Sequence, residues 1–296
     1  MIVYKDNDYG QDIDGNRGTT IYEIELEDNE IIELIDKLTA YTTLIGIPLN
    51  IGTGISRAVN YKNITREPYH KNLSRLSYVP QESAYLVKIG RMNGNASPMY
   101  YGSLITENTA SKSIITVLSE IKAEKNKIYN ILFSQVIGEI VVIPIGVFDY
   151  FRRGIDHPFK KNMHPNFEAV YKYYEENLKG DSILPLYLCD AFLNDVLRKK
   201  GSERLYKITS AIANECLSIS KADGIVYPSV EFIDHPNIVL KPEIVDKKIQ
   251  HKKAYSIYLE ESYGYGMYKL TFTHCGETSF DKIQWRKVEP KDFKNN

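Results

Sequence analysis

Apolar side chains recur every three or four residues in several stretches, the spacing of an amphipathic helix. The clearest stretch holds Ile114, Val117, Leu118 and Ile121, with Glu120 on the flank of the apolar stripe. The same spacing predicts helices within residues 20–45, 167–178 and 190–200, and another that Ser202 caps.

Strand-like stretches lie between these helices. Ile137–Ile145 is a nearly continuous apolar run with many β-branched residues, which is typical of a buried strand. Shorter strands are predicted at Ala84–Ile89, Ile225–Tyr227, Ala254–Leu259 and Met267–Phe272. The segment Gly46–Lys71 is rich in Gly, Asn, Pro and Thr and predicts a loop. Because the elements do not alternate regularly as βαβ units, the order indicates an α+β fold.

Composition excludes several classes of function. A net charge of −1 provides no general field for nucleic acid or acidic lipid, so nucleic acid is an unlikely partner. The longest apolar stretch, Ile137–Phe148, contains Glu139 and Pro144 and is too short to span a membrane. The three cysteines, like His157 and His164, lack metal-ligand spacing, so we expect neither disulfides nor a metal. The polar N-terminus is unlike a signal peptide, and we expect a cytoplasmic protein.

Taken singly, the polar residues of the middle region have ordinary explanations. Arg91 lies in an Asn/Gly turn, Glu120 is a helix residue of a common type, and Pro228-Ser229 is a turn dipeptide. The fragment Gly52-Thr53-Gly54 has no following Gly-Lys-Ser/Thr, so it is a weak nucleotide signature. The functional hypothesis therefore depends on the order and joint presence of these residues.

Three segments together resemble the RES domain, a family named for an Arg, a Glu and a Ser. They are Gly90-Arg91-Met92-Asn93 followed by Tyr101, the helix segment from Thr116 to Glu120, and Asp223-Gly224-Ile225-Val226-Tyr227-Pro228-Ser229. The last is the closest match, and Asn237-Ile238-Val239-Leu240-Lys241-Pro242 continues it as in longer members. The resemblance covers roughly residues 70 to 245.

The resemblance implies an ADP-ribosyltransferase-like fold of mixed sheets with flanking helices. It divides the chain into a helical and loop extension (1–70), an NAD-acting core (71–245) and a β extension packed on that core (246–296). It also implies NAD as substrate, an enzyme that cleaves the nicotinamide–ribose bond, and a growth-arresting toxin with a helix-turn-helix antitoxin as partner. NAD glycohydrolase, phosphorylase and ADP-ribosyltransferase activities stay open, because the acceptor can be water, phosphate or a protein side chain.

The chemistry gives the matching residues distinct roles. Glu120 would stabilise the oxocarbenium-like ribose, Arg91 would hold pyrophosphate or ribose, and Ser229 would hydrogen-bond to the cofactor or the nucleophile. Tyr101 would cover the nicotinamide or ribose. The resemblance places further cofactor contacts at Arg75, Asn93 and Tyr227.

Two departures from the family pattern keep alternatives open. Met92 replaces the usual aromatic residue, and the separation of Tyr101 from Glu120 is longer than usual, which requires an insertion near Asn108–Ser113. Glu107 therefore competes for the Glu role, although we favour Glu120 because it lies deep in a periodic helix that Glu107 precedes. The second hypothesis is a catalytically degenerate RES fold that binds a nucleotide or another protein without turnover.

Overall fold

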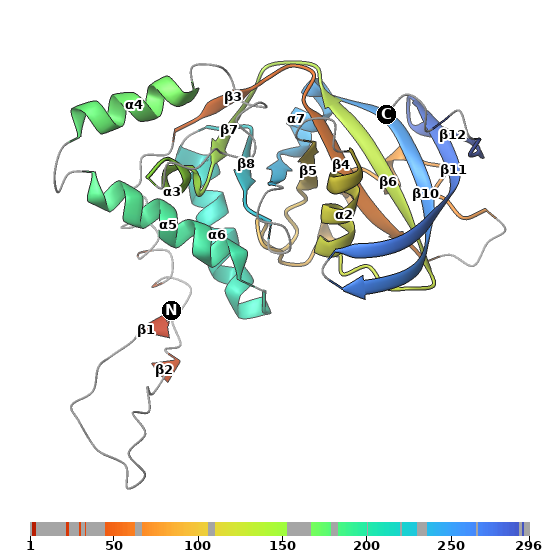
Figure 1. The fold of residues 1–296 in the computed structure, drawn as a ribbon, viewed down its shortest axis with the longest axis horizontal. Coiled ribbons are helices and arrows are strands. Elements are labelled where there is room, and N and C mark those ends of the chain that lie inside the picture. Colours follow the sequence, from red (N-terminus) through yellow and green to blue (C-terminus); the bar gives the residue numbers. More distant parts are fainter. Residues whose placement is uncertain are drawn as a thin grey trace, which may run out of the picture.

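The chain forms a mixed α+β fold around one large sheet (Figure 1). The structure is a computed structural model, and it describes residues 2–3, 22–23, 30, 33, 45–62, 67–105, 110–152, 167–178, 183–199, 201–219, 221–229, 236–264, 266–289 and 292. Among these residues, no helix has both the length and the apolar character needed to cross a bilayer.

Within the described part of the chain, ten strands make up the large sheet, in the order β12-β11-β10-β6-β4-β5-β9-β8-β7-β3. Their bounds are β3 (Ile47–Leu49), β4 (Gly54–Tyr61), β5 (Tyr100–Ile105), β6 (Lys127–Val136), β7 (Ile140–Pro144), β8 (Gly224–Tyr227), β9 (Asn237–Leu240), β10 (Ile249–Gly264), β11 (Met267–Ser279) and β12 (Lys282–Lys287). Every neighbouring pair is antiparallel except β7 and β8, which are parallel. Two short strands, β1 (Ile2–Val3) and β2 (Tyr22–Glu23), pair separately.

Helices cover two parts of this sheet. Helix α2 packs against β4 and β5, and α6 packs against β8 (Figure 1). The bounds are η1 (Leu73–Arg75), η2 (Gln81–Leu86), α2 (Ala110–Glu120), α3 (Val147–Arg152), α4 (Phe167–Asn177), α5 (Leu184–Arg198), α6 (Glu203–Ile219) and α7 (Pro242–Lys248). Ser202 caps α6 as predicted, since its Oγ accepts a hydrogen bond from the backbone N–H of Leu205 at 3.3 Å.

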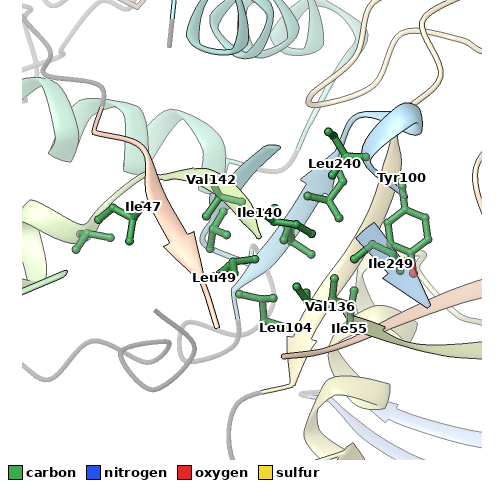
Figure 2. Close-up of a cluster of buried hydrophobic side chains, with 14 of the residues drawn as sticks. Ile47, Leu49, Ile55, Tyr100, Leu104, Val136, Ile140, Val142, Leu240 and Ile249 are labelled. Atoms are coloured by element: carbon green, nitrogen blue, oxygen red, sulfur yellow. The ribbon is translucent and has the colours of Figure 1, made fainter. Parts of the chain in front are cut away.

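Strands β8 and β9 are buried on both faces, which explains why their sequences are continuously apolar. Alternate residues enter two different clusters. Val226 and Ile238 join the core shared with β3 and β7, part of which Figure 2 shows, whereas Ile225 and Val239 pack with α5 and α6. This two-sided packing fixes the ends of β8 and β9, from which Ser229 and Asn237 extend.

The sequence-based expectations hold for most helices and fail in the predicted loop Gly46–Lys71, which contains β3 as well as β4, and at Ala84–Ile89. Gly54–Tyr61, predicted to be loop, is strand β4 in the middle of the sheet, because it pairs with β6 along its whole length. Ala84–Ile89, predicted to be a strand, begins within the 3₁₀ helix η2 and continues as irregular chain. Most of the helix expected in residues 20–45 lies outside the described residues.

The sheet draws strands from all three segments of the predicted division. Strands β3 and β4 come from residues before 71, and β10, β11 and β12 come from residues after 245. The division into separate domains stays a prediction. Strands β3, β4, β10, β11 and β12 nevertheless belong to the same sheet as the strands from residues 71–245.

Candidate active site

A pocket of about 340 Å³ opens beside the C-terminal end of α2. Its lining includes Arg91, Asn93, Tyr101, Glu120 and Tyr227, all of which the sequence analysis singled out. These residues come from a turn, two strands and a helix. The fold therefore brings the first two RES-like segments and part of the third to a common cavity.

Glu120 is the last residue of α2 rather than a residue deep within it. The helix stops there because Lys122 adopts a positive φ of 50°. The backbone N–H groups of Lys122 and Ala123 donate to the carbonyls of Ser119 and Leu118, both at 2.9 Å. A carboxylate at this end of a helix faces partial negative charge, so α2 itself does not stabilise the charge of Glu120.

Ser229 and Asn237 donate hydrogen bonds to the Glu120 carboxylate. Ser229 Oγ and Asn237 Nδ2 lie 2.7 and 2.8 Å from Glu120 Oε1. Ser229 is fully buried and contacts Glu120, but it does not line the pocket. In this structure Ser229 therefore acts on the carboxylate, and its predicted contact with a cofactor or nucleophile stays a prediction.

The turn that carries Arg91 is held by Tyr101. The Tyr101 hydroxyl donates to Asn93 Oδ1 at 2.6 Å and accepts from the backbone N–H of Met92 at 2.9 Å. Gly90 leaves room for this arrangement, because an added Cβ would lie 2.5 Å from Asn93 Oδ1 and displace that side chain. Burial raises the pKa of Tyr101 well above its ordinary value, so the hydroxyl stays protonated as a donor.

Arg91 is joined to the end of α5. Its Nη1 donates to the carbonyl oxygens of Leu197 and Lys199, the latter at 3.0 Å. Its Cζ also lies 5.9 Å from the ring centroid of Tyr206, another pocket residue. A cation is favourable at the C-terminal end of a helix, so Arg91 Nη1 stabilises the end of α5. The Arg91 side chain also lines the cavity.

Arg57, on β4, is a pocket residue that the sequence analysis missed. Its Nε donates to the Leu76 carbonyl at 3.1 Å and its Nη1 to the Tyr101 carbonyl at 2.8 Å. Burial lowers the pKa of Arg57, and among the described residues no carboxylate forms an ion pair with it. The sequence signal for Arg57 was weak. Ile55 and Val59 are β-branched, as in a strand, but the nearby glycines made the segment resemble a loop.

Arg75 and Glu107 do not take part in this arrangement. Arg75 is exposed at the end of η1 and does not line the pocket, so the structure does not support the expected cofactor contact. Glu107 lies outside the described residues. Of the two glutamates considered, Glu120 is the one for which the structure describes a pocket position.

The charges around the pocket suit an anionic ligand. Among the described lining residues, Arg57, Arg91 and Lys122 are cationic, and Glu120 is the one carboxylate. Forked guanidinium donors match phosphate oxygens, while a carboxylate suits a developing positive charge. Within the described parts of the chain, no group of three His, Cys, Asp or Glu could hold a metal ion.

No family model and no curated protein matches this chain. Among solved structures, the crystal structure of the M. tuberculosis MbcT–MbcA toxin–antitoxin complex matches with a TM-score of 0.38 and 9% sequence identity. That alignment covers 78% of this chain and 94% of the other.

Proposed function

We propose that this protein cleaves the nicotinamide–ribose bond of NAD. The observation that supports the proposal best is that Glu120 and Arg91, remote in sequence, line one pocket. The pocket volume of about 340 Å³ falls within the range of small-molecule sites. A carboxylate and two guanidiniums in one cavity match a substrate that carries a pyrophosphate and becomes cationic at a ribose carbon.

In the proposed reaction, the bond from ribose C1′ to the nicotinamide nitrogen breaks and nicotinamide leaves with the electron pair. The negative charge of Glu120 stabilises the oxocarbenium-like ribose that forms. Arg57 and Arg91 hold the pyrophosphate, and the Tyr101 ring limits the access of water. Water as acceptor adds its oxygen to C1′ and releases a proton, giving ADP-ribose; phosphate or a protein side chain reacts with the same cation.

The proposal is tested by incubating the purified protein with NAD, with and without phosphate, and identifying the products by mass spectrometry. We expect free nicotinamide, with ADP-ribose, ADP-ribose 1″-phosphate or a modified protein identifying the acceptor. Release of nicotinamide should fall at least about 100-fold in Glu120→Gln, while calorimetry still detects NAD binding. Intact NAD after incubation with the wild-type protein would overturn the proposal, and bound but uncleaved NAD would support a binding module.

Glu124→Gln is the matched control. Glu124 follows α2 by a few residues, is exposed and pairs with Lys127 at 2.7 Å, so its loss should leave turnover unchanged. If the activity depletes cellular NAD, expression of the wild-type chain should arrest growth and Glu120→Gln should relieve the arrest. A helix-turn-helix antitoxin would be the corresponding partner, and its co-expression should restore growth.

A further inference from the structure

Asn237 has a polar side chain that strand pairing does not require. It is the first residue of β9, only 3% exposed, with Tyr227 of β8 and Ser103 of β5 opposite it on the two sides. Backbone groups make those pairings, whereas the side chain lines the pocket and donates from Nδ2 to Glu120 Oε1. A buried amide whose donor is directed at the candidate catalytic carboxylate indicates a role beyond the fold.

We propose that Asn237 is a positioning residue that, together with Ser229, holds the Glu120 carboxylate in one orientation. The inference rests on the proposed function, because it assigns how the Glu120 carboxylate is prepared for the reaction. Ser229 lies just after the end of β8, and Asn237 is the first residue of β9. These two neighbouring strands are buried on both faces. The donors therefore belong to the rigid sheet, while the acceptor belongs to a helix end.

Orientation follows from both donors binding the same oxygen. The terminal torsion of a glutamate side chain has broad minima and does not by itself fix the carboxylate plane. Two hydrogen bonds to Oε1, at 2.7 and 2.8 Å, define that plane and hence the direction of the second oxygen. A pre-set carboxylate does not need to reorganise as positive charge develops on the ribose.

The hydrogen bonds depend on the donors that these side chains carry. A hydroxyl and an amide N–H each present a hydrogen to Glu120 Oε1. An aspartate in place of Asn237 has no amide hydrogen to donate and would set a second carboxylate against the first.

The test compares the wild-type protein with Asn237→Asp, Ser229→Ala and the control Ser103→Ala. Ser103 is a buried serine opposite Asn237, it does not line the pocket, and its Oγ donates to the Pro236 carbonyl at 3.4 Å. Nicotinamide release is measured as kcat and KM at pH 7, NAD binding by calorimetry, and folding by thermal melting. A role confined to the fold would alter melting without lowering the kcat of the folded protein.

We expect Asn237→Asp and Ser229→Ala to lower kcat at pH 7 by about 10- to 100-fold, the loss typical of one hydrogen bond to a charged group. KM and NAD binding should change little, so that the loss appears in kcat alone. Ser103→Ala should keep the wild-type kcat. If Asn237→Asp does not fold, Ser229→Ala provides the same readout, because it removes the other donor to Oε1.

The two proposals fail in distinguishable ways. A wild-type protein that releases no nicotinamide overturns both the proposed function and the role of Asn237. A wild-type protein that cleaves NAD, with folded variants that retain its kcat, overturns the role of Asn237 alone.

Discussion

Arg57 reaches across the sheet to Tyr101: its Nη1 donates to the Tyr101 carbonyl oxygen at 2.8 Å. The pairing of β4 with β5 ends at Ser56 and Ser103, one residue before Arg57, although both strands extend further. Gly102 permits this approach, because an added Cβ would lie 2.8 Å from the Ser56 carbonyl oxygen. The guanidinium therefore occupies the place where the two strands stop pairing, and there it lines the pocket.

The first prediction compares Arg57, which lines the pocket, with Arg75, which does not. Arg57→Ala should weaken NAD binding by about 10- to 100-fold, because it removes a charged donor from the pocket. Arg75→Ala should leave binding unchanged, since Arg75 is exposed outside the cavity. Calorimetric titration of both variants with NAD is the measurement. A larger loss in Arg75→Ala than in Arg57→Ala would contradict the assignment of Arg57.

The second prediction concerns the hydroxyl of Tyr101. Tyr101→Phe leaves the backbone N–H of Met92 and Asn93 Oδ1 without a hydrogen-bond partner that the structure now provides. We expect the free energy of unfolding to fall by about 1–3 kcal/mol, measured by urea denaturation. Tyr85→Phe is the control, because Tyr85 is 76% exposed and should lose almost nothing. Equal effects of the two substitutions would refute the role given to the Tyr101 hydroxyl.

The third prediction concerns pH and His251. Burial, and to a smaller extent the charge of Arg57, lower the pKa of His251 to about 4, with Asp246 acting in the opposite direction. Its ring nitrogens form hydrogen bonds with Ser134 Oγ at 2.8 Å and Ser77 Oγ at 3.2 Å. Because histidine in an unfolded chain titrates near ~6.5, the unfolded state binds more protons between that pH and about 4.

The free energy of unfolding should therefore decrease as the pH falls from ~6.5 to about 4, by at most about 3 kcal/mol from this residue. Above ~6.5 its contribution should be constant. Urea denaturation of the wild-type protein and of His251→Gln across this range measures the effect, and the variant should show a shallower slope. Parallel curves would show that His251 does not carry the pH dependence.

Periodicity predicted the elements whose stability is local. The 3.6-residue repeat located α2 and α6, and alternation located the β10–β11 hairpin, because neighbouring residues alone determine these patterns. Strand β4 escaped prediction because its partners, β5 and β6, lie far along the chain. Only the tertiary structure supplies the pairing that makes Gly54–Tyr61 extended.

The candidate site likewise has residues that the sequence identified and residues that only the tertiary structure identified. The resemblance to the RES domain selected Arg91, Tyr101 and Glu120, which now line one cavity. It placed an earlier arginine at Arg75, whereas the structure has Arg57 in the pocket, because sequence order does not show which arginine faces inward. Asn237 was part of a matching segment, yet its bond to Glu120 depends on how β9 meets the end of α2.

The position of β6 between β4 and β10 has a consequence for folding during synthesis. Val136 of β6 pairs with Ile249 of β10, so one edge of β6 has no native partner until the later part of the chain has left the ribosome. Pairings between such distant segments form slowly, and an open edge invites contact with other chains. A nascent chain of this protein is therefore expected to expose this edge of β6 until β10 has been synthesised.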